Sequence, residues 1–331
     1  MSATLTVRDA LNHALDEALA SDPRVLVLGE DVADPAGGVS GVTKGLSTKH
    51  GADRVLDTPI SEAAIVGAAI GAALDGMLPV AEIMIMDFIG IALDQIANHA
   101  AKLRFMSGGR TPCPITVRTA VFGGLGSGAT HSQSLEAWFM HIPGLKVVVP
   151  STPADAKGLL TSCIFDPDPC VFVETVITYG ARGPVPDEPG FAIPLGQADV
   201  KREGRDVTVV SYGRAVFDAL TAAEELAADG IDVEVVDLRT LVPLDVTRVL
   251  ASVRKTGRAV VAHYATRFAG PGAELAATIG HELFGELRAP VERVGARFAP
   301  IPAAAGLEAA VFPSAGAIAD AARRTVSFGN G

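Results

Sequence analysis

Short apolar runs alternate with longer helical segments along most of the chain, and this alternation restricts the possible folds more than any other feature. The runs are rich in Val, Ile, Leu and Ala, which is typical of parallel strands covered by helices on both faces. The pattern therefore predicts an α/β fold with two consecutive doubly wound domains. The expected strands are Val25–Leu28, Val80–Ile85, Ile115–Thr119, Lys146–Val149, Val171–Glu174, Val207–Ser211, Val233–Leu238 and Ala259–His263.

Helices are expected between these strands. The clearest start is Ser151-Thr152-Pro153, where a hydroxyl residue precedes a proline in the first turn. The expected helices are Val7–Leu19, Glu62–Leu74, Ile89–Phe105, Pro153–Ile164, Ala215–Asp229, Leu244–Val253, one from Pro271, and Ser314–Thr325.

A segment rich in Gly and Pro, Gly180–Gly196, interrupts the alternation. Because proline breaks both helices and strands, we interpret it as an interdomain linker. The predicted domains are residues 1–188 and residues 189–331.

The charge and the apolar pattern exclude several classes of function. A net charge of −11 argues against nucleic acid as a partner, since phosphate binding needs a basic field. The longest apolar run, Ala63–Leu74, is too short to span a bilayer. The first residues carry acids and lack the basic start of a signal peptide, so we expect a cytoplasmic protein without membrane attachment.

The chain has three cysteines, Cys113, Cys163 and Cys170. They show no C-x-x-C spacing and no nearby histidine, so we expect free thiols rather than a zinc site.

Glu62 ends the sequence DTPISE and begins the apolar helix. One interpretation is structural: Thr58 or Ser61 caps the helix, and Glu62 complements its dipole. The other is functional, because a carboxyl group in an apolar site can stay protonated or share a proton with a ligand nitrogen.

Three further features have both a structural and a functional interpretation. The glycine-rich GGLGSG, Gly123–Gly128, lacks the context of a dinucleotide fold, which favours a turn over a ligand cradle. His131 follows it on the same loop, and binding residues are often found on loops. Phe88 follows a predicted strand and is either a core residue or a platform for a heteroaromatic ring.

Taken together, six segments resemble the beta subunits of the heterotetrameric decarboxylating component of pyruvate, branched-chain 2-oxo acid and acetoin dehydrogenases. The resemblance covers nearly the whole chain, in order. It implies a pyrimidine-binding domain of the thiamine diphosphate fold, followed by a transketolase C-terminal-type domain. The segments are VLGEDV (Val27–Val32), GVTKGL (Gly41–Leu46), Asp57–Ile83, Asp87–Lys102, His131–Leu160 and VVDLRTLVPLD (Val235–Asp245).

The resemblance implies a role for each matched residue. Glu62 matches the catalytic acid that hydrogen-bonds the N1′ atom of the cofactor's aminopyrimidine. Phe88 matches the aromatic residue that packs on the same ring. His131 matches the active-site histidine near the substrate and the lipoyl group, and Glu30 matches an acid in the polar channel between paired sites.

A smaller match concerns potassium. PCPIT (Pro112–Thr116) and SCIFDPDPC (Ser162–Cys170) resemble potassium-binding segments of branched-chain members. Oxygen atoms of such segments can bind a monovalent cation, although an ordinary acidic turn explains the sequence equally well. The candidate ligands are Cys113, Ile115, Cys163, Asp166 and Asp168.

The motif that holds Mg²⁺ and the diphosphate in this family, G-D-G followed by an asparagine, does not occur in the chain. The resemblance therefore implies that an alpha subunit holds Mg²⁺ and completes an α2β2 heterotetramer. It also implies oxidative decarboxylation of a 2-oxo acid, or cleavage of acetoin, with transfer to a lipoyl domain. The alternatives are a subunit of a split transketolase-like C2-unit transferase and a non-catalytic scaffold subunit.

Overall fold

The computed structural model describes residues 2–329, which form two compact units. The first contains the chain up to Phe122 and Trp138–Leu195, and the second contains Gly123–Ala137 and the chain from Gly196 onward. The domain boundary expected between residues 188 and 189 stays a prediction. Within residues 2–329, no helix combines the length and the apolar content that crossing a membrane requires.

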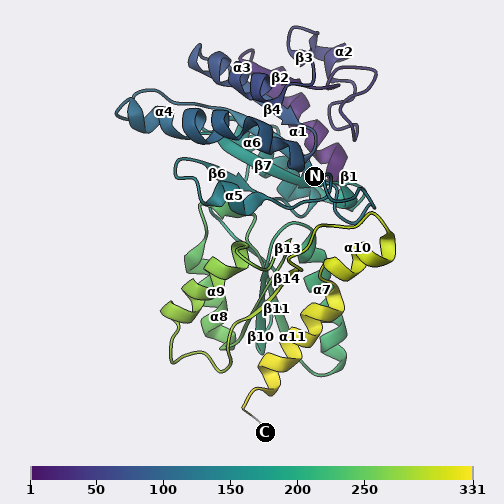
Figure 1. Ribbon diagram of the computed structural model, residues 1–331, viewed down its shortest axis with the longest axis vertical. Coiled ribbons are helices and arrows are strands. Elements are labelled where there is room, and N and C mark those ends of the chain that lie inside the picture. The colour runs from purple at the N-terminus through teal and green to yellow at the C-terminus, as the bar shows by residue number, and fades with distance from the viewer. Residues whose placement is uncertain (1, 330–331) are drawn as a thin grey trace. The chain divides into compact units, whose positions relative to one another are not determined.

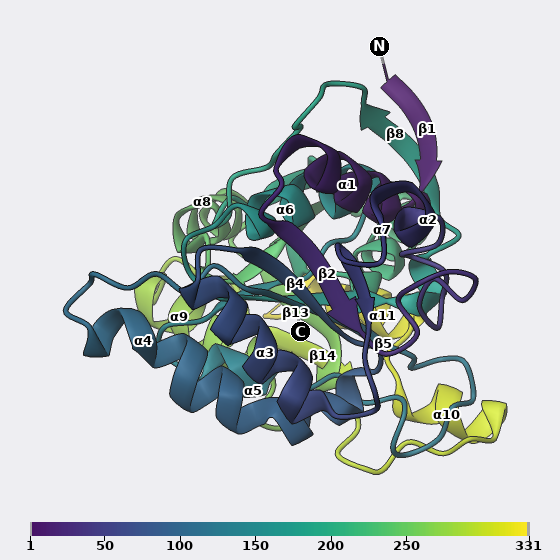
Figure 2. The same cartoon turned by 90° about the horizontal axis from the view of Figure 1, so that it is seen from above.

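The first unit is built on parallel strands in the order β6-β7-β5-β4-β2-β3. Helices α1 and α6 cover one face, and α3 and α4 cover the other (Figure 2). The strands β4 and β5 are buried along their whole length, as expected for a sheet covered on both faces. The bounds are β2 Val25–Gly29, β3 Val55–Asp57, β4 Leu78–Ile83, β5 Thr116–Val121, β6 Lys146–Val148, β7 Cys170–Thr175, α1 Val7–Ser21, α3 Glu62–Leu74, α4 Ala101–Met106 and α6 Pro153–Ile164.

The start of α6 agrees with the sequence prediction. The Thr152 side chain accepts the Asp155 amide, and the Asp155 carboxylate accepts the Thr152 amide in return. This reciprocal arrangement satisfies two amides that the first turn of a helix leaves unpaired.

A small antiparallel ribbon lies where the sequence predicted a linker. Strand β1, Ser2–Thr6, pairs with β8, Arg182–Pro186. Each strand of such a ribbon has a free edge, so prolines at alternate positions need not break its ladder. The linker prediction was therefore wrong for these residues.

The predicted helix Ile89–Phe105 is not one regular helix. The chain forms a 3₁₀ segment η1, Met86–Ala92, then a π-helical segment η2, Gln95–Ala100, and then α4. Gly90 lies within η1, and glycine weakens a regular helix locally. Both η1 and η2 pack against α3.

The second unit has strands in the order β14-β13-β10-β11-β9, parallel except for β9. Helices α7 and α11 lie on one side of this sheet, and α8 and α9 lie on the other (Figure 1). The bounds are β9 Asp199–Arg202, β10 Val207–Ser211, β11 Val233–Asp237, β13 Ala259–Thr266, β14 Glu292–Ala296, α7 Arg214–Ala228, α8 Val246–Thr256, α9 Pro271–Glu282 and α11 Ala315–Ser327. The remaining short elements of the chain, from either unit, are α2 Leu46–His50, α5 Glu136–Met140, η3 Val176–Thr178, β12 Thr240–Val242 and α10 Ala305–Val311.

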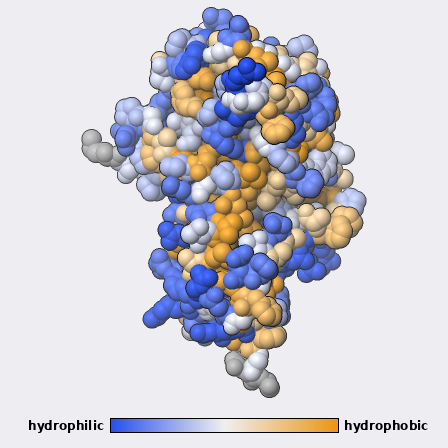
Figure 3. Space-filling model, turned by 90° about the vertical axis from the view of Figure 1, so that its left-hand side faces the viewer, coloured by the Kyte–Doolittle hydropathy of each residue, from blue (hydrophilic) through white to orange (hydrophobic). Residues whose placement is uncertain are grey.

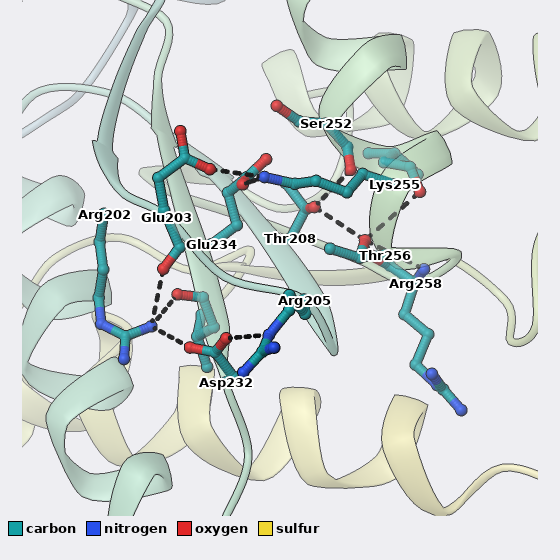
Figure 4. Close-up of polar contacts among 12 residues, drawn as sticks. Arg202, Glu203, Arg205, Thr208, Asp232, Glu234, Ser252, Lys255, Thr256 and Arg258 are labelled. Atoms are coloured by element: carbon teal, nitrogen blue, oxygen red, sulfur yellow. Dashed lines mark hydrogen bonds and ion pairs between the residues drawn. The ribbon is translucent and has the colours of Figure 1, made fainter.

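Polar contacts join the strands and helices of the second unit at one end of β10 (Figure 4). The Thr208 hydroxyl lies 2.9 Å from the Thr256 hydroxyl and 3.1 Å from the Ser252 carbonyl oxygen. The Lys255 ammonium pairs with Glu203 and with Glu234, whose side chain is fully buried. A buried carboxylate is costly without such a cation.

Replacing Lys255 with Met should leave the Glu234 carboxylate buried without its cation. We expect the free energy of unfolding to fall by about 1–3 kcal/mol, less than the roughly 3–5 kcal/mol lost when one partner of a fully buried pair is removed. The reason is that the Lys255 side chain is 42% exposed, so water screens the pair. Urea unfolding followed by circular dichroism measures the change.

Arg205 provides the matched control. It pairs with Asp232 in the same region, but its side chain is 86% exposed. The Arg205→Met substitution should change the free energy by less than about 0.5 kcal/mol. Equal losses in both variants would contradict the argument from burial.

Candidate active site

Glu62 lies in the first turn of α3 and is only 9% exposed. Among the described residues, its carboxyl group makes no hydrogen bond to another side chain. Ser61 occupies the N-cap position without a side-chain hydrogen bond, and the buried Thr58 hydroxyl has no described partner. The structure thus contradicts the capping role of Thr58 or Ser61 and leaves a buried acid available to a ligand.

Glu30 follows the end of β2 and is half-buried. Burial raises the pKa of its carboxyl group, and the charges of Asp31 and Glu62 raise it further. Glu62 therefore lies close enough to Glu30 for its charge to affect the pKa of Glu30, and the two acids belong to one region of the first unit. Gly29 is needed beside them, because a Cβ there would lie 2.7 Å from the Glu82 carbonyl oxygen.

Phe88 lies half-buried in η1, the segment that packs against α3. The fold thus places Phe88 on η1, next to the helix α3 that begins with Glu62. Phe88, Glu62 and Glu30 all belong to the first unit.

A buried ion network supports the same sheet. The Arg118 guanidinium on β5 donates to Glu82 on β4 at 2.7 Å, and to both oxygens of Glu174 on β7 at 2.7 and 2.9 Å. Tyr179 donates to the same Glu174 carboxylate. Burial alone would lower the pKa of Arg118, but the charges of Glu174 and Glu82 outweigh it and raise that pKa. The sequence reasoning did not find this network.

His131 lies on the segment Gly123–Ala137, which groups with the second unit. Its ring is half-buried, and its Nδ1 atom lies 3.0 Å from the Thr130 hydroxyl. Its backbone amide lies 3.4 Å from the Gly128 carbonyl oxygen.

The glycine-rich loop before His131 is a cradle for a carboxylate of the same chain. The amides of Gly124 and Gly126 donate to the two oxygens of Glu308, at 2.8 and 3.0 Å. Gly124 and Gly126 have φ angles of 94° and 72°, which favour glycine. The sequence favoured a turn over a ligand cradle, and in the structure two amides of this loop bind Glu308.

A second buried acid, Glu136, ends the same segment. Its Oε1 atom accepts the Tyr212 hydroxyl at 2.8 Å, whereas its buried Oε2 atom has no partner among the described residues. Burial raises the pKa of this carboxyl group, and the bonds from the backbone and from Tyr212 only partly oppose the effect. The Tyr212 ring stacks on His263 with centroids 6.0 Å apart. Glu136 lies within SLEAWF, but only the fold shows its burial.

The candidate potassium ligands are engaged in the fold. Asp166 pairs with Lys146, and Asp168 pairs with Arg104. The carbonyl groups of Cys113, Ile115 and Cys163 accept backbone amides. Among the described residues, no three or more His, Cys, Asp or Glu side chains form a metal-binding cluster. The potassium site stays a prediction.

Comparison with known families matches both units of the chain. Residues 3–181 match the pyrimidine-binding domain of transketolase, and residues 196–318 match the transketolase C-terminal domain. The chain is 48% identical to the beta subunit of acetoin:2,6-dichlorophenolindophenol oxidoreductase from Cupriavidus necator, over 99% of both proteins. It belongs to the family of E1 beta subunits of acetoin and pyruvate dehydrogenases.

Other E1 beta subunits are similar over almost the same length. The Bacillus subtilis protein of the same acetoin type is 45% identical over 95% of both chains. The mitochondrial pyruvate dehydrogenase E1 subunit beta-2 of Oryza sativa is 45% identical over 97% of this chain and 86% of that protein. A solved split-gene transketolase, described as an inactive beta4 tetramer, has a TM-score of 0.78 at 25% identity and covers 98% of both chains. These relatives confirm the two-domain fold expected from the sequence.

The raised pKa of Glu136 predicts a pH dependence of stability in this E1 beta subunit. The folded chain holds the Glu136 proton more tightly than the unfolded chain. Its stability should therefore fall as pH rises from the ordinary value of 4.5 through the higher folded-state pKa. In Glu136→Gln this contribution is absent, so its melting temperature relative to the native chain should rise between pH 4.5 and pH 8.

Glu286→Gln is the control, because that acid is half exposed and pairs with Arg254. Thermal melting across the pH range should show parallel curves for this control and the native chain. Parallel curves for Glu136→Gln as well would show that Glu136 titrates normally.

Proposed function

We propose that the chain is the catalytic beta subunit of an α2β2 thiamine diphosphate-dependent E1 component. The component decarboxylates a 2-oxo acid or cleaves acetoin, and it transfers the acyl or aldehyde unit to a lipoyl domain. The observation that carries the proposal is Glu62, a residue only 9% exposed at the start of α3, whose carboxyl group has no side-chain partner among the described residues. The E1 beta relatives that cover nearly the whole chain support it.

The first unit fits the aminopyrimidine half of the cofactor. A buried carboxyl group such as Glu62 suits a basic ring nitrogen, because it can hold a shared proton out of water. Phe88, on the neighbouring segment η1, offers a ring face to a heteroaromatic group. Bound thiamine diphosphate supplies the carbon nucleophile and the electron sink for cleavage of the substrate C–C bond.

Glu30 and His131 extend this assignment. Burial and the charges of Asp31 and Glu62 raise the pKa of Glu30, so this acid binds a proton more readily than an exposed one. We assign it to a polar path that leads to Glu62. His131, on a loop with a half-buried ring, is suited to donate a hydrogen bond or a proton to the substrate or the lipoyl group.

The surface of the chain supports a partner subunit. Large apolar side chains are exposed, among them Ile60 at 74%, two residues before Glu62. Figure 3 shows apolar surface gathered on the face drawn there. Contiguous exposed apolar surface marks interaction sites. Because the chain lacks the G-D-G motif, we assign Mg²⁺ binding to the alpha subunit; the potassium site remains part of the proposal.

The first experiment is to co-express the chain with its alpha subunit and replace Glu62 with Gln. The complex is assayed with thiamine diphosphate, Mg²⁺ and an artificial electron acceptor, against 2-oxo acids, acetoin and ketose phosphates. Glu62→Gln should lower turnover at least about 100-fold, because the amide cannot hold the shared proton. The matched control is Glu274→Gln, an exposed acid in the first turn of α9, which should leave turnover unchanged.

The panel distinguishes the alternative functions. Turnover of ketose phosphates alone would assign the chain to a split transketolase, for which the structural similarity to a split-gene transketolase is the supporting observation. A stable complex whose turnover is insensitive to Glu62→Gln would indicate a scaffold subunit. Turnover by the isolated chain would contradict the need for an alpha subunit.

A further inference from the structure

The segment that carries His131 is held by residues far along the chain. Residues 123–137 follow β5, within the match to the pyrimidine-binding domain, yet they pack as part of the second unit. The Glu308 side chain is 4% exposed and accepts two backbone amides of the segment, one at each carboxylate oxygen. Hydrogen bonds to a charged carboxylate are stronger than those between neutral groups.

Steric contacts restrict the same loop. A Cβ at Gly126 would lie 3.1 Å from the Ala303 carbonyl oxygen, and one at Gly123 would lie 2.8 Å from the Phe312 ring. Arg214 donates to the Gly123 carbonyl oxygen at 3.2 Å. The segment therefore lies directly against the residues that flank α10, and a Cβ at Gly123 or Gly126 would be crowded there.

These contacts restrain the backbone that leads to His131. The His131 amide contacts the Gly128 carbonyl oxygen, two residues after the last clamped glycine. At the other end of the segment, Glu136 accepts the Tyr212 hydroxyl. His131 lies between these two anchors, and its Nδ1 atom is 3.0 Å from the Thr130 hydroxyl. The Glu308 carboxylate thus restrains the backbone of the loop that leads to His131.

We propose that Glu308 is a positioning residue for the reaction and that it acts through His131. Its carboxylate holds the glycine loop in one conformation, which keeps the imidazole at the place where it meets the substrate or the lipoyl group. The inference rests on the proposed function of His131. It assigns a positioning role to a residue of α10, which contacts the loop through two backbone amides.

The test uses the assembled complex and the Glu308→Gln variant. The amide keeps the size of the side chain, but one of the two loop amides then faces an NH₂ group and loses its acceptor. We expect kcat to fall about 10- to 100-fold with little change in KM, since small displacements of a catalytic group are costly. Glu286→Gln, a surface acid, should retain full turnover.

A double-mutant cycle separates positioning from a general structural effect. If Glu308 acts through His131, the His131→Ala/Glu308→Gln variant should turn over no more slowly than His131→Ala alone. If the two losses multiply, Glu308 acts independently of His131 and the proposal is wrong.

Hydrogen exchange tests the clamp without reference to activity. In Glu308→Gln the amides of residues 124–131 should exchange faster, while those of β10 keep their protection. Unchanged exchange would overturn the clamp itself, whatever the complex catalyses. Faster exchange with native turnover would overturn the catalytic role alone.

Gly126→Ala disturbs the same contact from the loop side. Its φ of 72° and the close Ala303 carbonyl oxygen oppose a Cβ. This variant should reproduce the loss of kcat and the faster exchange with the Glu308 carboxylate intact. Native behaviour of Gly126→Ala would count against the loop conformation as the cause.

Discussion

The buried guanidinium of Arg118 is the interaction on which the first unit most depends. It joins three neighbouring parallel strands, because Glu82 lies on β4 and Glu174 on β7. Two carboxylates this deep would be unstable without a cation, and the cation would be unstable without them. The backbone of Glu82 also meets Gly29, the residue before Glu30. The strand that carries Glu82 of this network therefore lies directly beside the end of β2, where Glu30 follows.

In the second unit, two buried carboxylates anchor the segment Gly123–Ala137. Glu308 accepts two glycine amides, and Glu136 shares a hydrogen bond with Tyr212. The two acids are used differently. Glu308 pairs both oxygens with donors, whereas Glu136 leaves one buried oxygen without a described partner and has a raised pKa. The pairing of Glu308 fits a charged anchor, whereas the environment of Glu136 fits an acid that keeps its proton.

Local sequence predicted the elements that have strong local signals. The strand Val207–Ser211 and the helices Glu62–Leu74 and Pro153–Ile164 have the predicted bounds, because apolar period and capping residues act within a few positions. The prediction of one helix over Ile89–Phe105 was wrong, because the apolar period of a sequence does not indicate where an α-helix gives way to 3₁₀ and π segments. The ribbon β1–β8 was missed because its partners lie at opposite ends of the first unit's sequence.

The apolar pattern of the sequence by itself predicted the fold class, and the resemblance of six segments to E1 beta subunits gave the family and the candidate residues Glu62, Phe88, Glu30 and His131. Only the tertiary structure decided that Glu62 is buried without a side-chain partner in residues 2–329, and that the glycine loop binds Glu308. The physical reason is that burial and hydrogen-bond pairing depend on groups far apart in the chain. A carboxyl group has the same local sequence whether its partner is water, an arginine or a pair of backbone amides.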